Sequence, residues 1–447
     1  MPLAEFPIDK RSALLLDKEN MTKYSISPMS SLYELYLRHP RISTDSRRIE
    51  PDSVFFALRG ASFDGNRFAA DALEKGAAYA VVDDPSLPNT RPDKADRLIV
   101  VDDALQTLQA LAREHRRELG LPILAITGSN GKTTTKELVS RVLAEKYEVY
   151  ATRGNLNNHI GVPLTLLAMT RDVEFGIVEM GASACGEIAL LCSIAEPNYG
   201  IVTNIGRAHL EGFGGPEGVR RGKGELYDWL ARAGGRVFVP ANDPVLMSMA
   251  AERETLAAEC YPTTLADGVE HHLEGDYNRF NVAAAVAVGR YFGVDDERIR
   301  YAVGSYRPDN HRSQKIRTGQ NTLILDCYNA NPSSMQASLV NFRQEPLEGC
   351  TQKILILGDM LELGDWSDAE HRHIISLAAE IPDARILLIG PHFAKAYRSL
   401  ESRPADTTLY PSQEALAAEL RKHPVSQALI LVKGSHSIGL ERLADLL

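Results

Sequence analysis

The chain has 447 residues, of which 44% are hydrophobic and 24% are charged, and this is the composition of an ordinary globular protein. At about 150 residues per domain, the length predicts about three domains. The formal net charge of −10 argues against a surface that binds nucleic acid. The sequence has no apolar run of about 18 residues, so we expect no membrane insertion.

The amino-terminal segment and the cysteines bear on where the protein works. The first twenty residues mix acidic and basic side chains and do not resemble a secretory signal, and patterned sequence begins near Met21. The five cysteines are scattered without a Cys-x-x-Cys pair, so they predict neither a zinc site nor a disulfide framework. Both observations favour a reducing cytoplasm.

The first block of the chain is predicted to be a small α/β unit. Apolar runs at 53–58 and 78–82 predict two strands, with a helix over 68–76 between them. A second helix is predicted over 104–119, and the glycine and proline that follow it mark a domain boundary.

The most informative feature of the chain is a glycine-rich loop between a predicted strand (123–126) and a predicted helix. Backbone N–H groups and the positive end of such a helix converge on an anion. Lys132 can add a point charge for β/γ-phosphates, and the Thr133 hydroxyl can ligate Mg²⁺. Ile126 stands where the longer form of this loop has a glycine, so a plain glycine turn is the alternative. The predicted ATP contacts of the loop are Gly128, Ser129, Asn130, Gly131, Lys132, Thr133 and Thr134.

Two further residues follow predicted strands of the same block. Strands are expected at 175–180, 200–203 and 236–240, and helical segments between them imply a mostly parallel sheet. Ligands of such sheets bind beyond the carboxyl ends of the strands, where Glu179 and His209 fall. Glu179 is a candidate Mg²⁺ ligand, with a surface ion pair as the alternative. His209 is a candidate metal or phosphate contact, with a structural hydrogen bond as the alternative.

Other charged residues carry weaker signals. Lys223 lies in a basic stretch, where a lysine is usually solvated. His271, His272, His371 and His373 have no partner at metal-ligand spacing and are interpreted as structural or surface residues.

The last block is predicted to be a third α/β unit. Buried strands are expected at 323–325, 353–357, 385–389 and 428–432, with helical stretches between them. No short-period repeat or low-complexity tract interrupts it.

The motifs together resemble the Mur ligase family of ATP-dependent amide-bond-forming enzymes, over nearly the whole chain from about residue 40. The segment 127–133 resembles the shortened phosphate loop of that family, so the missing glycine is a match. By this resemblance Glu179 and His209 are the metal-associated residues, and Lys223 is the lysine that family members carbamylate with CO₂. A carbamate would turn a cation into an anionic oxygen ligand suited to Mg²⁺.

The resemblance also implies the nucleotide contacts and the domain plan. It implies that Asn281 contacts the adenine nucleotide, that Arg312 meets ATP phosphate, and that Asp326 holds ribose. We expect an α/β chain of three domains, namely a small N-terminal domain for a UDP-linked substrate, a central P-loop ATPase-like domain with a mostly parallel sheet, and a C-terminal Rossmann-like domain for the incoming amine. Their expected limits are 21–120, 121–312 and 313–447.

Within the family, several segments resemble the enzyme that adds D-alanyl-D-alanine to UDP-N-acetylmuramoyl-tripeptide. They are 154–163, 328–332, 357–364 and 432–435, while 43–47 and 63–66 also fit the ligase that forms the tripeptide. That sister enzyme carries an Asp-Asn-Pro-Arg string, which does not occur here. Cys327 is a departure, since relatives often have serine there. The implied substrate contacts are Ser46, Arg47, Asn157, Asn158, Asn329 and Asn331.

The implied reaction has two steps. The tripeptide carboxylate attacks the γ-phosphate of ATP, and the amine of D-alanyl-D-alanine then attacks the acyl phosphate. By the resemblance, Lys132, His209 and Lys223 are the catalytic residues, Mg²⁺ sits on Thr133, Glu179, His209 and the Lys223 carbamate, and a mobile third domain excludes water. We expect a monomer in the bacterial cytoplasm. Location alone makes Asp359, Glu362 and 433–435 candidates for gripping the dipeptide, and the third residue of the tripeptide is not predicted.

Four alternatives remain open at this stage. Two are ligases, the sister enzyme that adds the third amino acid and a folylpolyglutamate synthase-like enzyme. The third is a catalytically silent nucleotide-binding scaffold, which intact Lys132, Glu179 and Lys223 disfavour. The fourth is a phosphate-loop kinase, which would release a phosphorylated product instead of an amide.

Overall fold

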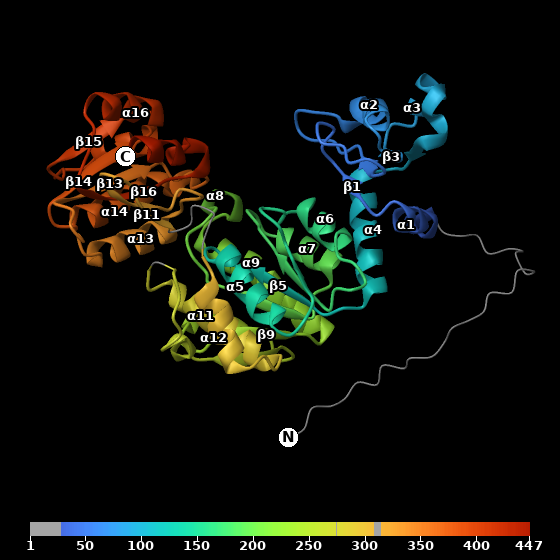
Figure 1. The fold of residues 1–447 in the computed structure, drawn as a ribbon, viewed down its shortest axis with the longest axis horizontal. Helices are drawn as coiled ribbons and strands as arrows, with labels where there is room; N and C mark the ends of the chain where they lie inside the picture. Colours follow the sequence, from blue (N-terminus) through green and yellow to red (C-terminus); the bar gives the residue numbers. More distant parts are fainter. Residues whose placement is uncertain (1–27, 274, 308–313) are drawn as a thin grey trace, which may run out of the picture.

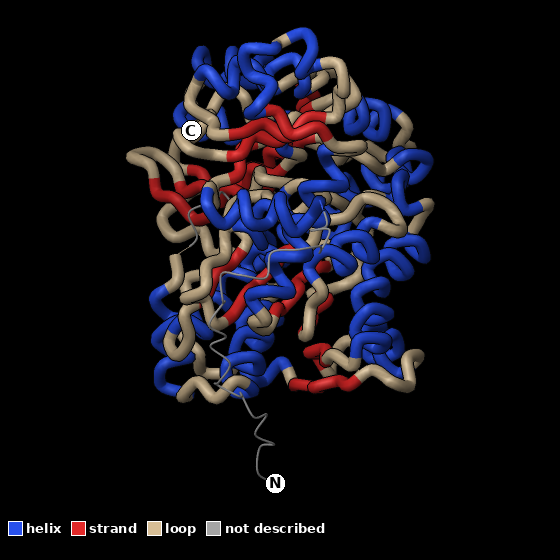
Figure 2. Tube along the Cα trace, turned by 90° about the vertical axis from the view of Figure 1, so that its right-hand side faces the viewer, coloured by secondary structure: helices blue, strands red, loops and turns tan. Residues whose placement is uncertain are grey.

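The computed structural model describes residues 28–273, 275–307 and 314–447, and these form three α/β units, each built on its own sheet (Figure 1). Helices surround the strands in the view turned by 90° (Figure 2). The three-domain α/β architecture expected from the sequence is therefore confirmed.

The first unit has four parallel strands in the order β1-β2-β3-β4. Its elements are α1 (Pro28–Arg38), β1 (Ile42–Ser43), β2 (Val54–Phe56), α2 (Ala69–Glu74), β3 (Tyr79–Val82), α3 (Leu87–Thr90), β4 (Leu98–Val100) and α4 (Ala104–Leu119), with short 3₁₀ turns at Gly65–Phe68 and Pro92–Arg97.

Helix α4 begins and ends where the sequence predicts. The Asp103 side chain accepts a hydrogen bond from the backbone of Gln106, which caps the first turn. Gly120 ends the helix in the left-handed conformation, with φ of 64°. Leu108 and Leu111 of α4 pack in one hydrophobic cluster with helices of the central unit, so α4 joins the first unit to the second.

The central unit has six parallel strands in the order β10-β9-β8-β5-β7-β6. The strands are β5 (Ile123–Thr127), β6 (Val149–Ala151), β7 (Phe175–Glu179), β8 (Tyr199–Val202), β9 (Arg236–Pro240) and β10 (Ala257–Tyr261). The helices are α5 (Lys132–Ala144), α6 (Gly161–Leu167), α7 (Glu187–Ala195), α8 (Leu210–Phe213), α9 (Pro216–Ala233), α10 (Pro244–Ala251), α11 (Asn278–Tyr291) and α12 (Asp296–Ser305), with a 3₁₀ turn at Thr263–Ala266.

Both faces of the central sheet are covered, which explains the continuous apolar runs of its inner strands. One face packs in a cluster with α5, α11 and α12, and the other packs in a cluster with α4, α6, α7 and α9. Strands β5 and β7 are adjacent in a register that pairs Ile126 with Glu179. The loop after β5 and the end of β7 are therefore neighbours.

The third unit has six strands in the order β11-β12-β16-β13-β14-β15, and β11 alone runs antiparallel. The strands are β11 (Gln314–Arg317), β12 (Thr322–Leu325), β13 (Gln352–Gly358), β14 (Ala384–Ile389), β15 (Thr407–Tyr410) and β16 (Ala428–Lys433). The helices are α13 (Pro332–Gln344), α14 (Ser367–Ala379), α15 (Pro391–Arg398) and α16 (Gln413–Lys422), with 3₁₀ turns at Gly364–Trp366, His436–Ile438 and Leu440–Leu446.

The third unit docks on the central one through α8. Leu210 and Phe213 of this short helix are buried in the same cluster as core residues of the third sheet, and Val219 at the start of α9 joins them. Figure 1 shows α8 reaching toward the third unit. The two units thus share an apolar contact beside the carboxyl ends of the central strands.

Removing the hydroxyl group from each of two buried tyrosines should affect the stability of the fold in different ways. The hydroxyl of Tyr36 donates to the carbonyl of Leu167 at 2.5 Å, whereas the buried hydroxyl of Tyr227 has no hydrogen-bond partner within the described residues. Removing a satisfied buried hydroxyl leaves the carbonyl unpaired and costs about 1–3 kcal/mol, whereas removing an unsatisfied one relieves a desolvation cost. We therefore expect Tyr36→Phe to lower the free energy of urea unfolding and Tyr227→Phe to leave it unchanged or raise it. Equal losses in both variants would contradict this interpretation.

Candidate active site

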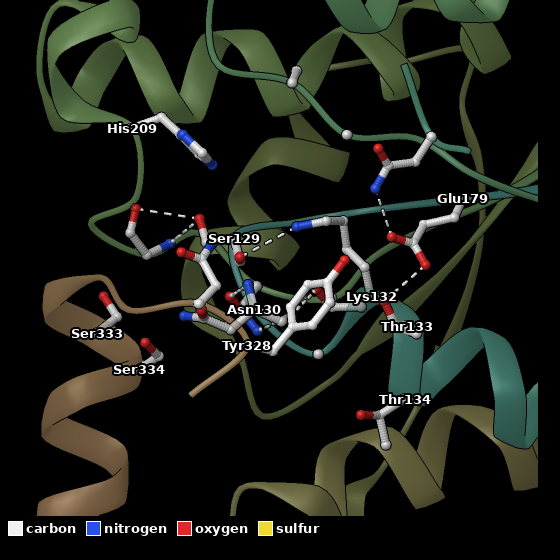
Figure 3. Close-up of a pocket in the computed structure, with 18 of the residues that line it drawn as sticks. Ser129, Asn130, Lys132, Thr133, Thr134, Glu179, His209, Tyr328, Ser333 and Ser334 are labelled. Atoms are coloured by element: carbon white, nitrogen blue, oxygen red, sulfur yellow. Dashed lines mark hydrogen bonds between the residues drawn. The ribbon is translucent and has the colours of Figure 1, made fainter. Parts of the chain in front are cut away.

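A cavity of about 890 Å³ lies between the central and third units, at the carboxyl ends of the central strands. Lys132, Glu179 and His209 face this common space, and Tyr328 and Ser333 of the third unit lie on its other side (Figure 3). Of the residues predicted from the sequence, those that line it are Ser129, Asn130, Gly131, Lys132, Thr133, Thr134, Asn157, Asn158, Glu179, His209, Asn281, Asp326, Asn329, Glu362 and Lys433.

The loop between β5 and α5 needs glycine at two positions. Gly128 has φ of 139°, and a Cβ there would lie 2.0 Å from Oγ1 of Thr203. Gly131 has φ of 78°, and a Cβ there would lie 2.6 Å from Oδ1 of Asn281. Helix α5 starts at Lys132, so the backbone N–H groups of its first turn point into the loop, as in an anion-binding site.

The end of β8 holds this loop in shape. The Asn204 side chain accepts from the backbone N–H of Asn130 at 3.1 Å, and the Thr203 hydroxyl donates to the Asn130 carbonyl at 2.6 Å. The backbone N–H of Gly206 donates to the Ser129 hydroxyl at 2.8 Å. Sequence reasoning did not single out Asn204, although its place just after a predicted strand was a usable signal.

Glu179 is a buried carboxylate at the end of β7, and its side chain is not in a surface ion pair. Its Oε2 accepts from the Thr133 hydroxyl at 2.9 Å, and its Oε1 accepts from the Asn157 amide at 2.8 Å. The Lys132 ammonium donates to the carbonyls of Gly128, at 2.7 Å, and Ser129, so it lies inside the loop. A carboxylate, a hydroxyl and a lysine therefore surround one side of the loop.

His209 has φ of 53° and immediately precedes α8. Its Nδ1 is hydrogen bonded to the carboxylate of Glu362, which belongs to the third unit. Burial lowers the pKa of His209, the Glu362 carboxylate partly offsets this, and the Lys132 ammonium lowers the pKa further. In the neutral ring, an Nδ1–H that donates to Glu362 leaves the Nε2 lone pair to act as an acceptor.

Lys223 is buried on α9, so its interpretation as a solvated surface lysine is wrong. Its Nζ donates to the carbonyl of Ala182, which lines the cavity, at 3.0 Å and lies 5.0 Å from the ring centre of Phe213. Burial, and then the nearby Lys132 charge, lower the pKa of Lys223 well below its usual range. This shift favours the uncharged, nucleophilic form of the amine.

The predicted nucleotide contacts fall on two sides of the cavity. Asn281 accepts from the Thr135 hydroxyl at 3.0 Å, which places it against the start of α5. Asp326 accepts from the buried Lys433 at 2.5 Å and from Ser338 at 2.7 Å. Arg312 lies outside the described residues.

Some predicted residues do not line the cavity. Asn331 caps α13 and donates to the Asn130 side chain at 2.8 Å, so it reaches the phosphate loop from the third unit. Ser46 and Arg47 lie in the first unit, where Arg47 pairs with Asp45 at 2.8 Å. The described, sequence-predicted residues outside the cavity lining are Ser46, Arg47, Gly128, Lys223, Asn331, Asp359, Gly434 and Ser435.

Two buried polar residues of the third unit have structural roles. His371 is buried, and its ring bonds the Ser367 carbonyl at 2.7 Å and accepts from the Met360 backbone at 3.1 Å, as its structural interpretation requires. Both Asp359 oxygens accept from backbone N–H groups at the start of α15, at 2.8 and 2.9 Å. Asp359 is also absent from the cavity lining, so it is a poor candidate for binding the dipeptide.

Polar contacts between the central and third units surround Arg207. Its backbone N–H donates to the Ser333 hydroxyl at 2.7 Å, and its guanidinium pairs with the buried carboxylate of Glu370 at 3.0 Å. Burial raises the pKa of Glu370, and the Arg207 charge opposes that rise. These contacts hold the third unit against the loop that carries His209.

The described residues lack two further features. No group of three or more histidine, cysteine, aspartate or glutamate side chains is placed to hold a metal ion. No described helix combines the length and apolar character needed to cross a bilayer.

Comparison with known proteins assigns the class. Three family models match the chain, namely the Mur ligase family catalytic domain over residues 40–116, the Mur ligase middle domain over 126–264 and the Mur ligase glutamate ligase domain over 311–436. The chain belongs to the Mur ligase family.

Relatives within the family match along almost their whole length. The UDP-N-acetylmuramoyl-tripeptide--D-alanyl-D-alanine ligase of Bacillus subtilis is 34% identical over 432 residues, with 90% of this chain and 92% of that protein covered. Crystal structure I of MurF from Acinetobacter baumannii superposes with a TM-score of 0.78 at 30% identity, covering 91% of this chain and 93% of that one. The structure of MurF ligase from Thermotoga maritima in complex with ADP superposes with a TM-score of 0.77 at 25% identity, covering 92% of this chain and 97% of that one.

The crowding at Gly128 gives a direct test of the loop. Gly128→Ala places a methyl group 2.0 Å from Thr203 Oγ1 at a φ that L-residues rarely adopt, so we expect at least about tenfold weaker ATP binding. Isothermal titration calorimetry measures this directly. Gly319→Ala is the control, because a Cβ at Gly319 meets no described atom within 4 Å. Unchanged ATP affinity in Gly128→Ala would contradict the loop assignment.

Proposed function

We propose that the chain is the ligase that adds D-alanyl-D-alanine to UDP-N-acetylmuramoyl-tripeptide, with ATP converted to ADP and phosphate, in the synthesis of peptidoglycan precursors. The observation that carries the proposal is the single cavity into which the phosphate loop, Glu179 and His209 all face. Relatives with this printed name match along nine-tenths of the chain, and the Thermotoga neighbour holds ADP.

Each of the three units would bind one ligand. Residues 21–120 would bind the UDP-linked substrate through Ser46 and Arg47, and 121–312 would bind ATP. Residues 313–447 would bind the incoming dipeptide. Asn157, Asn158, Asn329 and Asn331 would position the reacting parts of the substrates, because each lines the cavity or contacts its phosphate loop.

The first step joins two anions, the tripeptide carboxylate and the γ-phosphate. Two like unit charges about 4 Å apart repel by about 4 kcal/mol at an effective dielectric near 20, which is about three powers of ten in rate. The Lys132 ammonium and the backbone N–H groups at the start of α5 offset this repulsion where charge develops on the transferred group. Asn281, Arg312 and Asp326 would hold the rest of the nucleotide.

The oxygens beside the loop suit a magnesium ion. Mg²⁺ prefers oxygen ligands and usually takes only one or two from protein side chains. The Thr133 hydroxyl and the Glu179 carboxylate, 2.9 Å apart, supply such a pair. Bound there, Mg²⁺ would neutralise charge on the phosphates.

A second ion would need anionic oxygen near His209, because an imidazole nitrogen alone is a poor Mg²⁺ ligand. The uncharged Lys223 amine can add to CO₂, forming an N–C bond and releasing one proton to give a carbamate. The Lys223 amine contacts the carbonyl of Ala182, which lines the cavity, and this position fits the role.

The second step requires that water be kept away from the acyl phosphate until the amine arrives. The third unit covers the cavity, and its contacts with Arg207 and α8 hold it in place. The ammonium of the dipeptide first loses one proton to solvent. The amine nitrogen then forms a bond to the carbonyl carbon and loses a second proton, while the C–O bond to phosphate breaks and inorganic phosphate leaves. We further propose a monomer in the bacterial cytoplasm, where the cysteines among the described residues, all free, would stay reduced.

Phosphate release tests the proposed reaction. Wild-type protein with ATP, Mg²⁺ and UDP-N-acetylmuramoyl-tripeptide should release phosphate at a sustained rate only when D-alanyl-D-alanine is present, and mass spectrometry should find the amide. Lys132→Ala and Glu179→Ala should each lose at least about a hundredfold in kcat while keeping their melting temperature. Turnover with single amino acids instead of the dipeptide would favour the sister ligase, and a phosphorylated end product would favour a kinase.

Chemical rescue tests the role of Lys223. Lys223→Ala should lose most activity because the anionic oxygens of the carbamate are gone, and short carboxylic acids such as acetate should restore part of it. Lys136→Ala removes another buried lysine of the same unit, whose ammonium donates to the Thr152 carbonyl at 2.6 Å, and acetate should not rescue it. A folded Lys223→Ala variant that no short acid rescues would contradict the carbamate.

A further inference from the structure

We propose that Glu362 binds the ammonium group of the incoming dipeptide and so positions its nitrogen for attack, an inference that rests on the proposed ligase function. The dipeptide carries a positive α-amino group near neutral pH, since such groups have a pKa of about 8. A carboxylate at the cavity wall is the group that recognises it. Glu362 is the residue of the third unit that meets this requirement.

The backbone of Glu362 is held at the boundary between two units. Its carbonyl accepts from the backbone N–H of Glu211 at 3.2 Å, and its φ is 60°. Its carboxylate lines the cavity, with the side chain 60% exposed. One carboxylate oxygen, Oε2, contacts Nδ1 of His209, so the carboxylate lies beside a residue of the proposed phosphoryl site.

The other carboxylates that line the cavity are already engaged. Asp326, also from the third unit, pairs with Lys433 at 2.5 Å. Glu179 is held by Thr133 and Asn157. Glu187 accepts from the Ser183 backbone at 2.7 Å, and Asp243 accepts from the first turn of α10, at 2.9 and 3.0 Å. These contacts of Glu187 and Asp243 use one oxygen each, but both residues belong to the central unit. Of the two described lining carboxylates of the third unit, Asp326 is paired with a lysine, whereas Glu362 contacts His209 through Oε2 and is 60% exposed.

The position also suits the chemistry of the second step. The bound ammonium must lose a proton before it attacks, and the half-exposed Glu362 leaves it open to solvent that can take this proton. The resulting amine must reach a carbonyl carbon whose phosphate lies near Lys132, and both Lys132 and His209 line the same cavity as Glu362. The third unit carries Glu362, so the ammonium site is complete only while that unit rests on the central one. Binding of the dipeptide and closure of the cavity are thereby coupled.

Glu362→Gln separates charge from shape, because glutamine can still accept from His209 but carries no negative charge. We expect the KM for D-alanyl-D-alanine to rise about ten- to a hundredfold, as when a hydrogen bond between charged groups becomes one to a neutral group. The KM values for ATP and UDP-N-acetylmuramoyl-tripeptide should change less than about twofold, since neither ligand has a cation at this place. Inhibition by N-propionyl-D-alanine, which is the dipeptide without its amino group, should be equal in the wild type and the variant.

Glu370→Gln is the matched control for a loss of domain contact. Glu370 also makes an ion pair across the two units, with Arg207 at 3.0 Å, but it does not line the cavity. Weakened docking should raise the KM of every ligand bound between the units together, without selectivity for the amine.

A Glu362→Gln variant with an unchanged KM for the dipeptide would overturn the proposal, and so would one that changes all three KM values in parallel, as Glu370→Gln is expected to do. Failure of the ligase function itself has a different signature. In that case the wild type would form no amide with D-alanyl-D-alanine, so there would be no KM for the dipeptide to compare.

Discussion

The hydrogen bond between the Thr133 hydroxyl and the Glu179 carboxylate is the contact on which the rest of the site depends. It joins the helix after β5 to the end of β7, and these strands are neighbours with Ile126 opposite Glu179. Parallel pairing forces the phosphate loop and the carboxylate to the same edge of the sheet. The Asn157 amide holds the second oxygen of Glu179, so the buried charge is satisfied on both sides and its position is set.

A sheet edge alone makes an open site, and the third unit turns it into a cavity. Its contacts are of two kinds, an apolar one on Leu210 and Phe213 and a polar one around Arg207. Both lie on the segment that carries His209, so the docking contacts and a proposed catalytic residue share one segment. The Asn331 amide continues this contact onto the phosphate loop itself through Asn130. A nucleotide in the loop would therefore influence how the third unit rests on it.

The sequence predicted the inner strands of all three sheets and none of the edges. Of the sixteen strands in the described residues, the six that were missed are β1, β4, β6, β10, β11 and β15, which are the two edge strands of each sheet. Inner strands such as β7 are buried along their whole length and have continuous apolar sequences, whereas β6 and β10 are partly exposed and have mixed sequences.

In the site, glycine spacing predicted the loop because it reflects local backbone geometry. Pairings between residues distant in the chain, such as that of Glu362 with His209, depend on tertiary packing and could not be predicted. The burial of Lys223 could not be predicted either, because its neighbours in the sequence are basic although it packs against an aromatic ring in the fold.

One cavity between two units would hold the nucleotide with its phosphates on the loop after β5. A crystal structure with a non-hydrolysable ATP analogue and Mg²⁺ is the decisive test. We expect the phosphates among the backbone N–H groups of residues 128–133, the metal on Thr133 and Glu179, and the ribose toward Asp326. A nucleotide bound at another surface, or phosphates turned away from Lys132, would contradict this placement.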